Sequence, residues 1–207
     1  DEFHSLLTSQ VASIVGTVIS GLSATHIGSI DCTLLASLSV TQLASLSTRT
    51  VSNLTSTNIN ALTTTQLSNL TPATIAALST TVVASLTGSQ LEALSAQELS
   101  SLTASQASAL TSTQIASLTA TQVNSLSATG LSGLTATQIS GLTTSQIQGL
   151  TQTSVRALSS SAVSGLTSTQ IAALTTTQFT SLSATGIKGF SATQIASLTA
   201  GQVSLLT

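Results

Sequence analysis

Residues 110–125 read LTSTQIASLTATQVNS, two copies of one eight-residue pattern. Leucine or a close substitute recurs every eight residues over positions 6–206, and a second apolar series over positions 3–203 precedes it by three residues. The two series define 26 octads in one register, without an insertion. Unbroken repetition is typical of a solenoid. We therefore expect residues 1–207 to form a single octapeptide-repeat solenoid, with more apolar, atypical repeats over residues 1–22.

The spacing of the apolar residues distinguishes helix from strand. Side chains on a strand alternate between faces every two residues, whereas the gaps here alternate between three and five, which would put the two series on opposite faces. A helix places residues i and i+3 on one side, as for Ile115 and Leu118. One continuous helix is excluded because an eight-residue period drifts by roughly 80° per repeat on a 3.6-residue turn. Each octad is predicted to hold one short helix.

A helix start is visible in almost every octad. The residue after each leucine is Ser, Thr or Asp at all 24 positions over residues 23–207, and Gln or Glu often follows three residues later, as in Thr111–Gln114 and Ser95–Glu98. This pattern is a capping box, in which the hydroxyl accepts from the N–H of the third helical residue, whose side chain reaches back to the cap. The single proline, Pro72, stands at a first helical position, where proline is tolerated.

Such short helices are unstable alone because nucleation is costly, so the octads must stack with the Leu and Ile series inside. The residue before each leucine is Ser, Ala or Gly in 23 of 26 octads, with two asparagines and Leu205 as exceptions. Small residues there would let helices approach closely. We predict an all-α solenoid of 26 short capped helices; the alternative is a β-solenoid with Thr-x-Thr strands. Departures from Gln 24 residues apart, at His26, Thr50 and Thr74, hint at three helices per coil.

The composition excludes several functional classes. The chain has three Lys or Arg and five Asp or Glu, so it offers no basic patch for nucleic acid. Nucleophilic catalysis needs a base beside its hydroxyl or thiol, but both histidines, His4 and His26, precede most of the chain, and His26 takes a Gln position. Glu98 is interpreted as a capping residue and Glu92 as structural or solvated. Two His and one Cys make no zinc site. We expect no enzyme, cofactor or metal.

Three features bear on the setting of the chain. Cys32, at a first helical position, is either a small helix-start residue or the site of an intermolecular disulfide. Residues 6–22 are apolar but interrupted by polar residues, whereas a transmembrane helix needs about 20 predominantly apolar residues, so no transmembrane segment is expected. The chain begins with Asp1 rather than Met, which suits a removed signal peptide or a fragment of a longer chain. We expect an extracellular or cell-surface location.

The octad at residues 110–117, LTSTQIAS, resembles octapeptide-repeat stretches with the pattern L-[ST]-x-x-Q-[ILV]-x-x in large secreted bacterial surface proteins. The resemblance covers essentially all 26 octads except the N-terminal end around Leu7 and Val15. It implies a repetitive stalk, adhesin or extracellular-fibre segment, and it carries over no catalytic or binding residue.

These observations favour a structural protein that assembles with itself. Soluble solenoids normally close their ends with atypical polar repeats, but both ends of this chain carry apolar residues. A head-to-tail contact that does not close into a ring produces a filament. We therefore expect a homopolymer in the form of an extracellular filament, tube or sheath. The predicted assembly interface comprises Leu7, Val15, Val18, Leu205 and Leu206.

Two other functions stay open at this point. A cell-surface adhesin or stalk, attached to the cell, would be monomeric along its length, unlike a filament. Ice binding is suggested by the recurrent Thr-x-Thr, which would form ordered hydroxyl rows. Packed helices lie about 8–10 Å apart, however, against about 4.8 Å for adjacent strands, so helical stacking spaces the threonines widely. Electron microscopy would identify a filament, and thermal hysteresis would identify ice binding.

Overall fold

The computed structural model describes residues 32–182 and 184–205. These residues form helices and connecting turns without any strand, so the predicted all-α fold is confirmed and the β-solenoid alternative is wrong for the described ranges. The chain divides into two compact units, Asp1–Ser101 and Leu102–Thr207. One uninterrupted solenoid over residues 1–207 stays a prediction. The atypical repeats over residues 1–22 lie outside the described residues.

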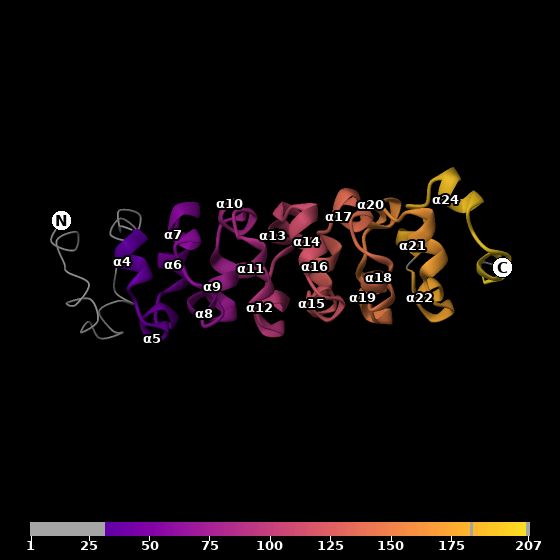
Figure 1. Cartoon of the computed structure of the whole chain (residues 1–207). Helices are drawn as coiled ribbons and strands as arrows, with labels where there is room; N and C mark the ends of the chain where they lie inside the picture. Colours follow the sequence, from indigo (N-terminus) through magenta and orange to yellow (C-terminus); the bar gives the residue numbers. More distant parts are fainter. Residues whose placement is uncertain (1–31, 183, 206–207) are drawn as a thin grey trace. The chain divides into compact units, whose positions relative to one another are not determined.

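Each described octad holds one helix, and these helices are four to six residues long (Figure 1). The first unit contains α4 (Cys32–Ala36), α5 (Val40–Ala44), α6 (Thr48–Val51), α7 (Ser56–Asn60), α8 (Thr64–Leu67), α9 (Pro72–Ala77), α10 (Thr80–Ala84), α11 (Gly88–Glu92) and α12 (Ala96–Ser100). The second unit contains α13 (Ala104–Ala109), α14 (Ser112–Ser117), α15 (Ala120–Ser125), α16 (Ala128–Ser132), α17 (Ala136–Ser140), α18 (Thr144–Gln148), α19 (Gln152–Ala157), α20 (Ser160–Ser164), α21 (Ser168–Ala173), α22 (Thr176–Ser181), α23 (Ala184–Ile187), α24 (Ala192–Ala196) and α25 (Ala200–Ser204).

The break between two helices can be followed from α13 to α14. Leu110, which ends α13, and Thr111, which caps α14, are both extended, with ψ values of 143° and 156°. Thr111 Oγ1 accepts from the N–H of Gln114 at 3.1 Å, and Gln114 Oε1 accepts from the N–H of Thr111 at 2.7 Å. No described residue has a positive φ. Two extended residues and a capping box therefore make the turn, and the boxes predicted at Thr111–Gln114 and Ser95–Glu98 are both present.

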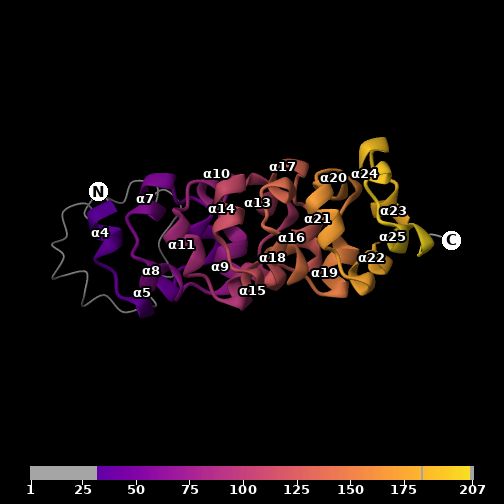
Figure 2. The same ribbon diagram turned by 45° about the vertical axis from the view of Figure 1, so that its right-hand side comes forward.

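Three helices make one coil within each unit. In the first unit α4 packs on α7, α5 on α8, α6 on α9 and α9 on α12; in the second, α13 packs on α16, α16 on α19 and α19 on α22. Each helix thus contacts the helix three places along, 24 residues away. The short helices of each unit can be followed in successive coils in Figures 1 and 2. The 24-residue spacing of the departures from Gln reflects this coil.

The two apolar series form the core. Ile59 in the first unit and Ile139 in the second have no exposed surface, and the leucines between the helices are almost as deeply buried. Even Ala107, the small member of the isoleucine series, is fully buried. Burying one such Leu or Ile side chain contributes about 1.5–3 kcal/mol. Stacking, rather than helix propensity, therefore stabilises these short helices.

Candidate functional site

The third residue of many helices is a glutamine whose amide joins successive coils. In α17, Gln138 Oε1 accepts from the N–H of the cap residue Thr135 at 2.7 Å. Its Nε2 donates to the carbonyls of Ala107 at 2.8 Å and Leu110 at 2.6 Å. These carbonyls lie at the end of α13, where a helix leaves carbonyls without an internal partner. One side chain therefore caps its own helix and binds the end of a helix in the preceding coil.

The same clamp, defined as this pair of roles of one glutamine amide, recurs at a constant offset. Its Nε2 donates to carbonyls 28 and 30 or 31 residues earlier. The clamps join Gln66 to Ala36 and Leu38, Gln90 to Ile59 and Leu62, Gln146 to Ala116 and Leu118, Gln170 to Ile139 and Leu142, Gln178 to Ile147 and Leu150, and Gln194 to Val163 and Leu166. A buried amide left unpaired would cost about 1–3 kcal/mol. The clamps therefore make the stacking specific as well as apolar.

At one position the preceding coil supplies the cap. Ser154 stands where the repeat has glutamine, and its side chain is too short to reach the N–H of its own cap residue, Thr151. Asn124 from the preceding coil replaces it: Asn124 Oδ1 accepts from the N–H of Thr151 at 3.0 Å and from Ser154 Oγ at 2.5 Å. The shortened side chain and the asparagine therefore form a matched pair 30 residues apart.

Glu98 is the acidic residue at the third position of α12. Its Oε2 accepts from the N–H of Ser95 at 2.7 Å, which completes the capping box. Its Oε1 is buried and has no hydrogen-bond partner. A carboxylate has no hydrogen to donate, and by the constant offset the carbonyls that a glutamine would bind belong to Leu67 and Leu70. Glu98 therefore caps its helix without clamping the coils.

Small residues before the leucines bring successive coils into backbone contact. A Cβ on Gly133 would lie 2.3 Å from the carbonyl oxygen of Ala104, and one on Gly165 would lie 2.2 Å from that of Ala136. In both pairs the contacted residue lies 29 positions earlier. No side chain fits between these segments, so the close approach predicted from the small residues is confirmed at these positions.

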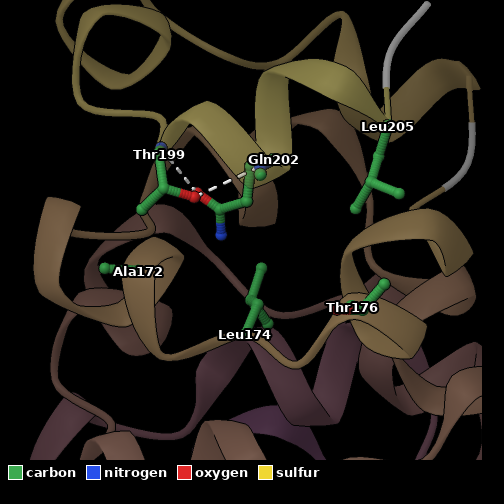
Figure 3. Close-up of a pocket in the computed structure, with 7 residues that line it drawn as sticks. Ala172, Leu174, Thr176, Thr199, Gln202 and Leu205 are labelled. Carbon is green, nitrogen blue, oxygen red and sulfur yellow. Dashed lines mark hydrogen bonds between the residues drawn. The ribbon is translucent and has the colours of Figure 1, made fainter.

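The last coil of the second unit presents apolar side chains to solvent. Ile195 and Val203 are 56% and 48% exposed, although Ile171 and Phe179, one coil earlier in the same series, are 0% and 1% exposed. Leu205 is 40% exposed. We call Ile195, Val203 and Leu205 the C-terminal face. Beside it, a pocket of about 210 Å³ separates α25 from the start of α22 (Figure 3).

The structure places only part of the predicted assembly interface. Leu205 lies on the C-terminal face, while Leu7, Val15, Val18 and Leu206 lie outside the described residues. Ile195 and Val203 were not predicted, because both match the repeat and only their place in the last coil exposes them.

The remaining candidate residues are scattered. Cys32 is half-buried at the first residue of α4, and a disulfide there stays a prediction. Glu92 is exposed, and both histidines lie outside the described residues. Across residues 32–182 and 184–205, no three His, Cys, Asp or Glu side chains are grouped as metal ligands would be. No helix in these ranges has the length and apolar character needed to cross a membrane.

Comparison with known proteins gives one match, which supports a repeat protein. A family model described as the ALTTAQ repeat matches residues 153–184. Within that match, residues 173–178 read ALTTTQ and run from the end of α21 into α22. No curated protein matches the chain. The family match and the regular short helices agree that the chain is a repeat protein.

Proposed function

We propose that this chain is a structural, non-enzymatic subunit that assembles head to tail into an extracellular filament, tube or sheath. The observation that carries the proposal is the C-terminal face. Its side chains occupy positions that another coil covers elsewhere in the same unit: Ile171 and Phe179 are buried where Ile195 and Val203 are exposed. An apolar face on a soluble protein is typical of an interaction site.

The interior of the second unit indicates which partner would fit this face. Each interior coil is covered by another coil of the same repeat, which supplies Leu and Ile side chains together with glutamine amides. Those amides donate to helix-end carbonyls, as Gln194 Nε2 does to Leu166 O at 2.6 Å. A second copy of this chain carries the same groups at the same 24-residue spacing. We therefore identify the partner as another copy of the chain.

The charge of the chain is compatible with such contacts. The formal net charge is −2 over 207 residues, and a low net charge leaves little electrostatic repulsion against close association. The two faces of a head-to-tail contact differ from each other, so growth continues unless the rotation between copies closes a ring. An open contact of this kind gives a filament or tube.

The test is electron microscopy of the purified full chain, together with sedimentation. We expect the wild-type chain to form polymers, and the double variant Ile195→Glu/Val203→Glu to remain monomeric with an unchanged circular dichroism spectrum. Thr113→Glu, which adds a charge at an exposed position of α14, is the matched control and should still polymerise. Monodisperse wild-type particles at high concentration would overturn the filament and favour the adhesin or stalk.

A further inference from the structure

We infer that Leu205 is a wedge that holds α25 partly open on the coil beneath it, so that the last helix is a lid poised to close. The inference has three parts: the position of Leu205 in the repeat, an incomplete glutamine clamp, and the pocket beside them. The wedge itself stands on the geometry of the second unit, and only its effect on assembly rests on the proposed function.

Leu205 occupies a position where the repeat requires a small residue. One coil earlier in the same position, Ser181 is only 7% exposed. At Gly133 even a Cβ would collide with the backbone 29 residues earlier. For Leu205 the residue 29 positions earlier is Thr176, at the start of α22. A leucine side chain therefore cannot enter the space between coils unless α25 stays away from Thr176.

The clamp of α25 is incomplete on this side. One coil earlier, Gln178 Nε2 donates to the carbonyls of Ile147 at 2.9 Å and Leu150 at 2.7 Å. Gln202 Nε2 donates to Ile171 O at 2.8 Å, but within the described residues it makes no hydrogen bond to Leu174 O, the equivalent of Leu150 O. The capping box of Gln202 with Thr199 is intact, so the helix is formed. What is missing is one of its two attachments to the coil beneath.

The pocket lies where the missing attachment would be. Its lining includes Leu174, Thr176, Gln202 and Leu205. Figure 3 shows Gln202 and Leu205 reaching from the last helix towards Leu174 and Thr176 on the facing turn. The residue whose carbonyl lacks its donor and the residue beneath the wedge therefore line the same space. Removal of the wedge would let α25 settle, bring the amide of Gln202 to Leu174 O and close the pocket.

Hydrogen exchange measured by mass spectrometry on the dilute, monomeric full chain tests the wedge. Leu205→Ser, which copies Ser181, and Leu205→Ala should each slow exchange in residues 199–205 by on the order of ten-fold, the effect of one added hydrogen bond on a local opening. The reciprocal variant Ser181→Leu should speed exchange in α22. Ile195→Ser removes exposed apolar surface without changing a small-residue position, and it should leave residues 199–205 unchanged.

Unchanged exchange in both Leu205 variants would overturn the wedge, and normal protection of α22 in Ser181→Leu would do the same. Light scattering then separates the wedge from the proposed function. If both hold, Leu205→Ser polymerises faster than wild type, because the incoming copy meets a closed coil. Slower exchange without polymers in any variant would retain the wedge and reject the filament. Polymers with unchanged exchange would retain the filament and reject the wedge.

Discussion

Replacement of Glu98 by glutamine should stabilise the protein. Glu98 already caps α12 through Oε2, but its buried Oε1 has no hydrogen-bond partner. Glutamine keeps the capping oxygen and replaces the second oxygen with an NH₂ group that can donate. By the offset seen for Gln90, which binds Ile59 O at 3.0 Å and Leu62 O at 3.0 Å, the new amide should reach the carbonyls of Leu67 and Leu70.

The magnitude follows from the number of groups that gain a partner. A buried polar group without a hydrogen bond costs about 1–3 kcal/mol, and Glu98→Gln removes one such group. The change should therefore raise the free energy of unfolding by about 1–3 kcal/mol. A chain of this size gains about 2–4 °C in Tm per kcal/mol, so the expected rise in Tm is roughly 2–10 °C.

Thermal and urea unfolding followed by circular dichroism at 222 nm would measure this effect. Glu92→Gln is the matched control, because it removes the same charge from an exposed position of the same unit and should change stability by no more than about 0.5 kcal/mol. Gln90→Glu is the reciprocal change. It keeps the capping oxygen, loses both inter-coil donors and should destabilise the chain by about 1–3 kcal/mol. If Glu98→Gln and Gln90→Glu both leave the stability unchanged, the inter-coil amide is not the stabilising group that we infer.

Further substitutions test other contacts between coils. Gly133→Ala should lower the free energy of unfolding by about 1–3 kcal/mol, because its Cβ would collide with backbone, whereas Gly141→Ala, whose Cβ would meet ordinary contacts at 3.5 Å, should be neutral or slightly stabilising in the same urea titration. Asn124→Ala should cost about 1–3 kcal/mol, and adding Ser154→Gln should restore much of the loss; a double variant no more stable than the single one would contradict their pairing. Pro72→Ala should cost about 0.4–1 kcal/mol through the entropy of the unfolded chain, and a stabilised variant in thermal unfolding would contradict that prediction.

The sequence alone determined the local structure of each octad. Capping boxes such as Thr111–Gln114 join residues three positions apart, and the helix breaks, the apolar series and the place of Pro72 all depend on contacts within eight or nine residues. Such contacts repeat identically in every octad, so the pattern displays them 26 times. The need for small residues was visible for the same reason, although not which backbone they approach.

Only the tertiary structure decided how the octads meet. The second role of glutamine, as in Gln138 with Leu110, and the pairing of Asn124 with Ser154 join residues 28–30 positions apart. Those offsets follow from three helices per coil, and the local pattern is equally compatible with other numbers. Glu98 shows the consequence: Glu and Gln are equivalent as capping residues, and they differ only where a neighbouring coil presents a carbonyl that needs a donor. The exposure of Ile195 and Val203 has the same origin, because both match the repeat and only the coil that covers each side chain determines its burial.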